Sequence, residues 1–318
     1  MSMIQVQVRR KSLEAQDIAS FELVRPDGAP LPEFSAGSHI DVRLPDGMLR
    51  QYSLCNDDGD SRHYRIAVLR DAQSRGGSRA MHDAVGQGDL IEISPPRNHF
   101  PLVEAQRTLL FAGGIGVTPL LCMAQRLAKS GADFQLHYCV RTPDRTAFRD
   151  EIASSGFASR VGFHYDDGPA DQRLDLASVL AGPGPDVHAY VCGPQGFIDH
   201  VTAAARLHGW GDEQLHVEYF QAAPLDSTGD GAFRVKVASS GNVYGVPAGR
   251  TVVQVLGEHG IDIPVSCEQG ICGTCITGVL DGQCDHRDLY FTDEEKERND
   301  RFTPCCSRAK SPLLVLDL

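Results

Sequence analysis

The sequence has little positive charge, and its basic residues form no stripe that could follow a nucleic acid backbone. The chain of 318 residues carries a formal net charge of −12. Nucleic acid binding depends on clustered Lys and Arg that neutralise phosphates, whereas the short cluster Arg9-Arg10-Lys11 is more typical of a solvated face. We therefore expect no nucleic acid partner.

The chain also lacks long apolar segments and internal repeats. No run approaches the roughly 20 apolar residues that cross a bilayer, and residues 1–8 alternate like a strand, without the apolar core of a signal peptide. We expect a cytoplasmic protein with no membrane partner and mostly reduced cysteines. The length allows two or three domains.

Cysteines are concentrated near the C-terminus, where Cys267, Cys272 and Cys275 form a Cys-x4-Cys-x2-Cys pattern. This is the ligand spacing of a plant-type two-iron, two-sulfur cluster, which takes its fourth ligand from a distant segment. Cys305 and Cys306 are the candidates, and only one of two neighbours in an extended segment can face the cluster. Zinc or unliganded thiols are the alternatives. Zinc sites usually pair two short Cys/His clusters, and no second one follows here.

Residues 4–102 consist of short alternating segments separated by turns, which predicts an antiparallel barrel or sandwich. Arg50 and Tyr52 lie two positions apart on one predicted strand and so share a face. The Tyr ring can stack on a flat cofactor and the guanidinium can bind a phosphate. Ser53 could then address a ring nitrogen. Ordinary cross-strand packing is the alternative for this pair.

A second pattern in this region is the sequence Gly76-Gly77-Ser78 before a predicted short helix. The free backbone N–H groups of a helix N-terminus can bind an anion. A plain loop is the alternative reading.

In the middle of the chain, the apolar run Thr108–Ala112 predicts a buried parallel strand. A glycine-rich turn, Gly113–Pro119, and the helical pattern of Leu120–Lys129 follow it, which is the nucleotide-binding arrangement. The glycine spacing is not the dinucleotide fingerprint Gly-x-Gly-x-x-Gly. A later strand, Val187–Val191, leads into Cys192-Gly193-Pro194.

The last part of the chain predicts a hairpin, a helix at Thr251–His259, the cysteine loop and a final strand, which fit a β-grasp ferredoxin fold. The small, polar residues 223–231 before it predict a linker. The segment Asp285–Asp288 contains a lone histidine, His286, which we expect to be a surface or turn residue.

These patterns, in this order, resemble the phthalate dioxygenase reductase family within the ferredoxin–NADP reductase superfamily. The resemblance implies an antiparallel β-barrel flavin domain at 1–102, an α/β Rossmann-like nicotinamide domain at 103–222, and a β-grasp ferredoxin domain at 232–318 after the linker. The motifs that carry it are Arg50–Leu54, Gly76–Ser78, Gly113–Pro119 with Cys192–Pro194, and Cys267–Cys305.

The resemblance implies an NADH-dependent flavin iron–sulfur oxidoreductase, the reductase component of a Rieske-type aromatic-ring oxygenase or O-demethylase. Electrons would pass from NADH through FMN and a two-iron, two-sulfur cluster to the oxygenase, in a brief encounter. A reductase for another acceptor, such as a cytochrome monooxygenase, and a non-redox zinc-binding scaffold are the alternatives. NADPH is a second possibility for the donor, since Arg141 could meet a 2′-phosphate.

The resemblance also assigns site residues. The expected catalytic residues are Ser53, Thr118 and Cys192, although a buried strand end would also explain Cys192. The expected metal ligands are Cys267, Cys272, Cys275 and Cys305. Phe220 would cover the flavin, with ordinary packing as its alternative, and Gln51 departs from the family pattern. The expected cofactor-binding residues are Arg50, Gln51, Tyr52, Ser53, Ala67, Val68, Gly76, Gly77, Ser78, Gly113, Gly114, Gly116, Thr118, Pro119, Arg141, Gly193, Pro194 and Phe220.

Overall fold

The computed structural model describes residues 3–72, 76–221 and 227–318, and the chain divides into two compact units, Met1–Phe220 and Gln221–Leu318. Each unit is considered by itself. The predicted linker falls partly, at residues 223–226, outside the described residues, as does residue 222, the predicted end of the nicotinamide domain.

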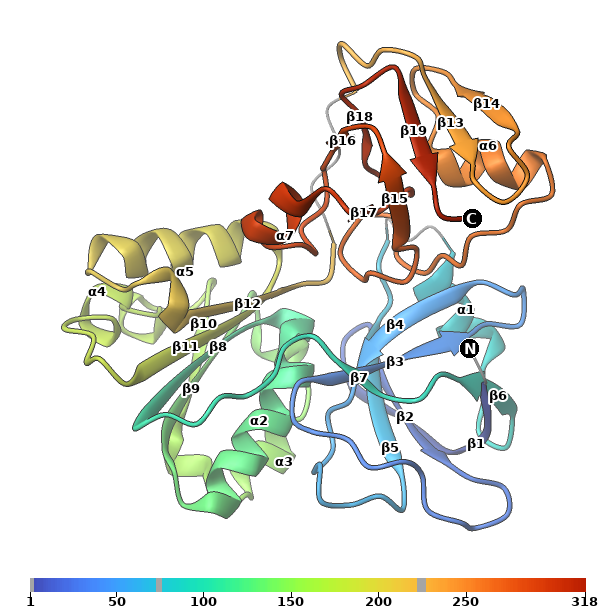
Figure 1. Ribbon diagram of the computed structural model, residues 1–318. Coiled ribbons are helices and arrows are strands. Elements are labelled where there is room, and N and C mark those ends of the chain that lie inside the picture. The colour runs from blue at the N-terminus through green and yellow to red at the C-terminus, as the bar shows by residue number, and fades with distance from the viewer. Residues whose placement is uncertain (1–2, 73–75, 222–226) are drawn as a thin grey trace. The chain divides into compact units, whose positions relative to one another are not determined.

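The first unit begins with an antiparallel β-barrel (Figure 1). Its sheet has the order β4-β3-β6-β1-β2-β5, with β7 paired to β3, and a bridge between Leu54 and Ile66 joins the β4 end to β5. The inward positions are apolar, as the alternation predicts; Val6 and Val8 of the first strand are fully buried. The strands are β1 (Ile4–Ala15), β2 (Ile18–Val24), β3 (Ser38–Arg43), β4 (Leu49–Ser53), β5 (Tyr64–Leu69), β6 (Leu90–Ile93) and β7 (Arg97–Asn98), with the helix α1 (Gly77–Ala84) after β5.

A parallel sheet of order β10-β9-β8-β11-β12 completes the first unit. The order reverses beside β8, and ligands of such sheets bind where the carboxyl ends of the strands meet this reversal. The strands are β8 (Arg107–Gly113), β9 (Asp133–Val140), β10 (Val161–Tyr165), β11 (Val187–Gly193) and β12 (Leu215–Tyr219).

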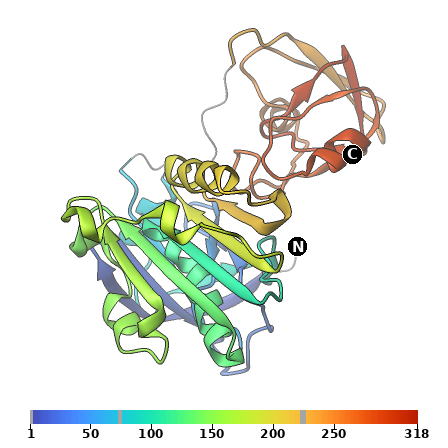
Figure 2. The ribbon, with the colours of Figure 1, turned by 90° about the vertical axis from the view of Figure 1, so that its left-hand side faces the viewer.

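Helices cover both faces of this sheet, as Figures 1 and 2 show. Leu110 and Ala112 of β8 pack with α2 (Val117–Ser130) on one face. Leu109 and Phe111 pack with α4 (Leu176–Val179) and α5 (Gln195–Leu207) on the other. Alternate side chains of β8 therefore pack into two different hydrophobic cores. The remaining short helices are α3 (Arg149–Ala153), η1 (Gly114–Gly116), η2 (Pro143–Arg145), η3 (Ala158–Arg160), η4 (Ala170–Gln172) and η5 (Asp212–Gln214).

The second unit contains a mixed sheet of order β14-β13-β19-β15-β17 and a separate pair, β16 and β18. β13 runs parallel to β19, with Arg234 paired to Leu313, although the 75 residues 238–312 lie between the two strands, so the last strand enters the sheet beside the first. The elements are β13 (Phe233–Val237), β14 (Val243–Val246), α6 (Val252–Glu258), β15 (Thr277–Asp281), β16 (Cys284–Asp285), α7 (Asp293–Arg298), β17 (Arg301–Phe302), β18 (Arg308–Ala309) and β19 (Leu313–Leu316).

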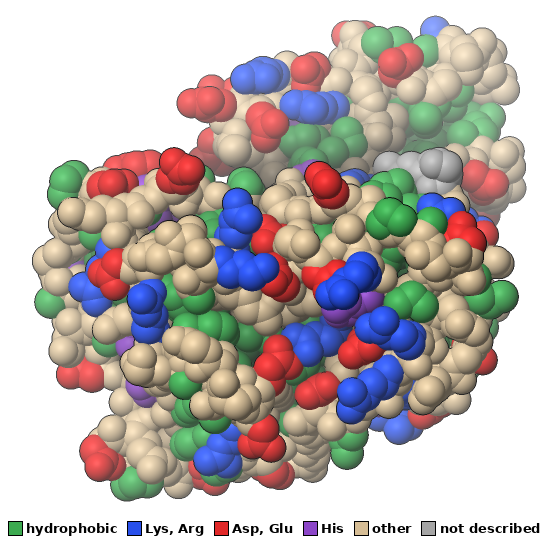
Figure 3. Space-filling model, turned by 90° about the horizontal axis from the view of Figure 1, so that it is seen from below, with side chains coloured by type: hydrophobic (Ala, Val, Ile, Leu, Met, Phe, Trp, Pro, Cys, Tyr) green, Lys and Arg blue, Asp and Glu red, His purple; other side chains and the backbone are tan. Residues whose placement is uncertain are grey.

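These parts confirm the predicted fold class: an antiparallel barrel, a Rossmann-like α/β sheet and a β-grasp unit. Basic and acidic side chains are interspersed on the face shown in Figure 3. Within the described ranges, no helix combines the length and apolar character needed to cross a bilayer.

Candidate functional site

The first candidate region is an anion-binding corner of the barrel, where Arg50 of β4 lies against the start of α1. A Cβ at Gly77 would meet the Arg50 side chain at 2.6–2.9 Å, so the arginine packs directly on the backbone of this glycine. Gly76, the N-cap residue with φ +104, provides no side-chain cap for the helix. A guanidinium beside the N-terminus of a helix is suited to a phosphate, so these residues fit the phosphate of FMN.

The other predicted residues of the barrel part lie on α1, β4 and β5. Ser78 accepts a hydrogen bond from the Asp71 amide, at 3.2 Å, through its hydroxyl oxygen. Tyr52 shares a strand face with Arg50, and burial raises the pKa of its phenol. Gln51 occupies the opposite face, where its amide lies 3.2 Å from His39 Nε2. Ala67 and Val68 are buried on β5.

The second region is the carboxyl edge of the parallel sheet, where the two glycine motifs pack on each other. Ala112 of β8 pairs with Cys192 of β11, so the turns that follow both strands leave the sheet side by side. At Gly116 a Cβ would collide with the backbone of Cys192 and lie 2.7 Å from the Gly193 nitrogen. Only glycine allows this approach. The N-termini of α2 and α5 therefore open at one edge, where they can bind phosphates.

A buried carboxyl group connects this edge to the barrel. Glu218 of β12 pairs with Cys192 of β11. The Ser53 hydroxyl donates to Glu218 Oε2 at 3.4 Å, and the Cys192 thiol lies 4.0 Å from the same oxygen. Glu218 as a whole residue is partly accessible, but protein atoms surround its carboxyl group. Burial raises the pKa of this carboxyl group to about 8, and the hydrogen bond from Ser53 opposes that shift.

Cys192 is a buried thiol. Burial, followed by the charge of Glu218, raises the pKa of Cys192 well above its ordinary value, so the thiol stays protonated at neutral pH. A thiol of this kind is a packing and hydrogen-bonding group, not a nucleophile. Its sulfur lies near the same Glu218 oxygen that accepts the Ser53 hydrogen bond.

The remaining predicted residues of this edge differ in what they contact. Thr118 is buried, and its hydroxyl donates to the Ile115 carbonyl at 3.0 Å, so it closes the glycine turn. Arg141 is exposed just beyond the carboxyl end of β9. Phe220 follows β12 and packs, half-buried, against the core shared by barrel and sheet. Gly114, with φ +54, and Pro119 belong to the turn and the first turn of α2.

The third region is the cysteine loop of the second unit. Contacts with Cys272 and then Cys305 lower the pKa of Cys267, against the effect of burial. The Gln269 amide donates to Cys267 Sγ at 3.3 Å, and the Thr274 amide to Cys272 Sγ at 3.5 Å. Backbone donors aimed at sulfur stabilise thiolates, as ligands of an iron–sulfur cluster require.

Cys305 and Cys306 face different neighbours in the turn Thr303–Ser307. The Cys305 thiol meets Cys267 first, then Cys275 and Cys306, and these contacts raise its pKa. Cys306 Sγ lies 3.2 Å from Thr303 Oγ1 and 3.8 Å from Ser307 Oγ, and it occupies the space where Gly270 would carry a Cβ. The thiol that meets the loop cysteines is therefore that of Cys305.

Among the described residues, no group of three or more His, Cys, Asp or Glu side chains is arranged around a point where one metal ion could be held. Four soft thiol donors and backbone N–H groups directed at sulfur are nevertheless the donor set of a two-iron, two-sulfur cluster. The residues present therefore fit that group.

Glu218 was not among the predicted site residues, and the prediction of His286 as a surface or turn residue is only half right, because His286 does lie in the irregular segment after β16. The signal for Glu218 was a single acidic residue inside a short strand directly before Phe220. His286 is not a surface residue: its side chain is 8% exposed and faces Asp288 at 3.3 Å.

Comparison with known proteins finds relatives that match almost the whole chain in sequence and in structure. The sequence profile described as "2Fe-2S iron-sulfur cluster binding domain" matches residues 235–310. The chain is 56% identical to a vanillate O-demethylase oxidoreductase of a Pseudomonas species, covering 99% of this chain and 100% of that protein. It resembles the solved phthalate dioxygenase reductase with a TM-score of 0.77 and 41% identity, covering 100% and 98% of the two chains.

A second solved structure contains the same arrangement as part of a longer protein. An intact type IV self-sufficient cytochrome P450 monooxygenase matches 99% of this chain with 41% of its own length, at a TM-score of 0.87 and 38% identity. The region that matches this chain is less than half of that protein, so the same architecture also occurs within a longer polypeptide.

Proposed function

Because this chain belongs to the phthalate dioxygenase reductase family, we propose that it is the reductase component of an oxygenase system, taking electrons from NADH. It is an NADH-dependent flavin iron–sulfur oxidoreductase. When bound, FMN and a two-iron, two-sulfur cluster supply the division of a two-electron donor into single-electron steps, which no side chain performs. The chain's own residues bind, orient and insulate these groups.

The observation that carries the proposal is the convergence of Ser53, Cys192 and Glu218 where the barrel meets the carboxyl edge of the sheet. Arg50 and the α1 N-terminus would hold the flavin phosphate, and Ser53 ends the same strand. The Gly113–Gly116 turn at the switch point, with Cys192 beside it, would hold the dinucleotide. Ser53 therefore lies between the residues that would bind the two groups.

Glu218 can hold a proton and exchange it with Ser53 where the barrel meets the parallel sheet. Its carboxyl holds a proton up to about pH 8 because of burial, and its Oε2 accepts from the Ser53 hydroxyl. Ser53 can therefore exchange a proton with Glu218 on one side and contact the flavin ring on the other. Thr118 supports this arrangement indirectly, by fixing the turn below the nicotinamide through Ile115.

In the second unit, Cys267, Cys272, Cys275 and Cys305 would hold the cluster. Contacts between Cys305 and two of the loop cysteines support its assignment as the fourth ligand. Cys306 would remain outside the ligand set, because its sulfur packs on Thr303 and Gly270.

We also propose the division into a flavin domain at 1–102, a nicotinamide domain at 103–222, a linker at 223–231 and a ferredoxin domain at 232–318. Separate hydrophobic cores in the barrel, on the outer face of the parallel sheet and in the β-grasp part support it. The barrel and the sheet share the core that contains Ala67 and Leu110, so they are expected to move together.

The partner is an oxygenase component. We propose that it is a Rieske-type aromatic-ring oxygenase or O-demethylase, met transiently in the cytoplasm. The family includes reductases of vanillate O-demethylase and phthalate dioxygenase systems, and a small, brief contact suits repeated single-electron delivery. A cytochrome P450 is the second candidate, because one such protein carries the same reductase architecture.

Removal of iron tests the relay order. In the purified protein, absorbance together with iron and acid-labile sulfide should report flavin and cluster. After chelation of the iron, NADH oxidation with a small dye should continue, while cytochrome c reduction should fall. Loss of both activities together would contradict the order.

A second experiment distinguishes the two candidate partners. Turnover of an aromatic methyl ether is measured with an added O-demethylase and compared with turnover by an added P450.

A further inference from the structure

The segment Asp285–Asp288 carries a carboxylate that is completely enclosed by the second unit. The side chain of Asp288 is 0% exposed and that of His286 is 8% exposed. Arg287, between them, turns its guanidinium outward to Asp230 and Asp285, both at 2.8 Å. A buried charge is costly unless hydrogen-bond donors surround it, so the partners of the Asp288 carboxylate determine whether it can be accommodated there.

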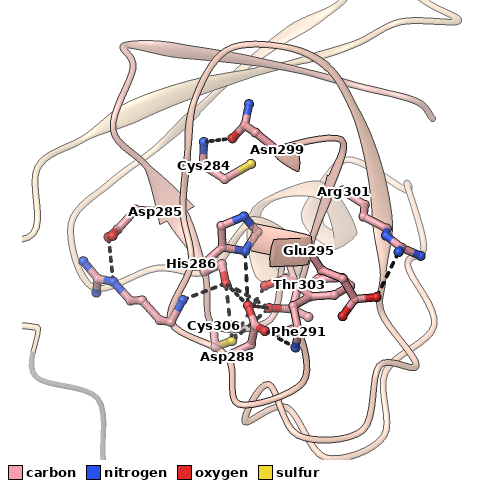
Figure 4. A network of polar contacts seen from close by, with 12 residues as sticks. Cys284, Asp285, His286, Asp288, Phe291, Glu295, Asn299, Arg301, Thr303 and Cys306 are labelled. Atoms are coloured by element: carbon pink, nitrogen blue, oxygen red, sulfur yellow. Dashed lines mark hydrogen bonds and ion pairs between the residues drawn. The ribbon is translucent and has the colours of Figure 1, made fainter. Parts of the chain in front are cut away.

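Asp288 contacts the turn that contains the fourth candidate ligand (Figure 4). Its Oδ1 accepts from the hydroxyls of Thr303 and Ser307, each at 3.2 Å, and faces His286 Nδ1 at 3.3 Å. Its Oδ2 accepts from the Phe291 amide at 2.9 Å. Thr303 and Ser307 are the first and last residues of the turn around Cys305, and both are almost fully buried. Asp288 therefore holds the two ends of this turn together.

The same residue also contacts the loop that contains the other three cysteines. A Cβ at Gly270 would lie 2.9 Å from both the Cα and the Cβ of Asp288. The Leu289 amide donates to the Gly270 carbonyl at 3.0 Å. Gly270, with φ +73, lies between Cys267 and Cys272. The backbone of Asp288 thus packs on one ligand-bearing segment while its carboxylate is bonded to the other.

We propose that Asp288 is a positioning residue of the iron–sulfur centre: it fixes the Cys305 turn against the Cys267–Cys275 loop and places a buried negative charge next to them. The proposal rests on the function assigned above, since it assumes that these cysteines bind a cluster. The carboxylate oxygens of Asp288 accept from two hydroxyls and a backbone amide and face a histidine nitrogen, so hydrogen-bond donors compensate for the burial of this side chain.

The charge has a consequence that a purely structural role would lack. Reduction adds one negative charge to an iron–sulfur centre, and its potential depends on nearby charge, hydrogen bonds and solvent exposure. A fixed carboxylate in a low-dielectric interior opposes that added charge. Asp288 should therefore keep the reduction potential of the centre low.

The decisive variant is Asp288→Asn in the full-length protein. Asparagine keeps the shape and one acceptor but loses the charge and the bond to the Phe291 amide. The expected results are a more positive midpoint potential, measured by a dye-mediated redox titration followed by electron paramagnetic resonance, and several-fold faster iron release to a chelator. Asp285→Asn is the matched control, because that carboxylate is partly exposed and paired with Arg287.

The outcomes separate this inference from the proposed function. If the wild-type protein binds no iron and sulfide, the proposed function fails. If the wild-type protein contains iron and sulfide, and Asp288→Asn has the same midpoint potential and the same iron-release rate as wild type, only the positioning role is overturned.

If Asp288→Asn does not fold, Ser307→Ala decides the question, because it removes one donor to Asp288 and keeps the charge. Faster iron release than in Ser311→Ala, a serine whose contacts are with Gln283 and Leu313, supports the proposal. An unchanged rate overturns it.

Discussion

Cys192 and Glu218 are cross-strand neighbours on β11 and β12, and the Cys192 sulfur lies 4.0 Å from the Glu218 carboxyl oxygen. The same oxygen accepts the Ser53 hydrogen bond. Neither strand of the sheet could create this arrangement alone, because Ser53 comes from the barrel. The contact of this pair with Ser53 therefore forms only when the barrel and the sheet are correctly assembled.

Glu218→Gln should change how stability depends on pH. The pKa of Glu218 is raised from 4.5 to about 8 by burial, so the native state keeps a proton that the unfolded chain releases between these values. Wild-type stability therefore falls as pH rises through this window, by up to a few kcal/mol. The neutral glutamine lacks this loss, so the melting temperature of the variant, relative to wild type, should rise between pH 5 and 8.

Glu213→Gln is the matched control for this measurement, because Glu213 is an exposed residue near the start of the same strand. Its melting temperature should follow the wild-type curve at every pH. Parallel curves for Glu218→Gln and wild type would show that Glu218 is ionised in the folded protein.

Ser53→Ala should slow reduction of the bound flavin by NADH. The variant removes the hydroxyl that donates to Glu218, and one hydrogen bond of about 1–1.5 kcal/mol corresponds to roughly tenfold in rate. The measurement is anaerobic stopped-flow bleaching of the flavin absorbance. Ser53→Thr keeps a hydroxyl and should retain most of the rate, while FMN content should stay equal in all three proteins. An unchanged rate in Ser53→Ala would exclude Ser53 from the reaction.

Much of this architecture was predictable because it depends on local pattern. The strand predicted at Val187–Val191 is observed as Val187–Gly193, and the helix predicted at Thr251–His259 is observed as Val252–Glu258, with Thr251 as its N-cap. Both follow from periodicity and capping within a few residues. The glycine turn after β8 was equally visible, because strand, turn and helix are consecutive in the chain.

The roles of Glu218 and Asp288 could not be predicted in the same way. Each is an acidic residue, which normally indicates an exposed position. Glu218 is enclosed because Ser53 is brought from a distant strand, and Asp288 because Thr303 and Ser307 fold back over it. Such burial depends on contacts between distant segments, and a single sequence has no local signal for them.

Arg50→Ala should weaken FMN binding. Hydrogen bonds from a charged group contribute about 1.5–3 kcal/mol, so the dissociation constant should rise roughly ten- to a hundredfold. Fluorescence titration of the flavin-free protein measures it. Arg43→Ala on the neighbouring strand is the control, because its ion pair with Glu92 is about half exposed and contributes little. Equal affinities for both variants would remove Arg50 from the phosphate site.

Cys305→Ser and Cys306→Ser should have opposite effects on the iron–sulfur centre. The Cys305 thiol meets Cys267 and Cys275, so its replacement should abolish cluster assembly, with loss of visible absorbance, iron and acid-labile sulfide. Cys306 instead contacts Thr303 and Ser307, which a serine hydroxyl can also reach, so Cys306→Ser should stay loaded. Dye reduction by NADH should be equal in both variants, because the flavin site lies in the other compact unit. A loaded Cys305→Ser protein beside an empty Cys306→Ser protein would reverse the assignment of the fourth ligand.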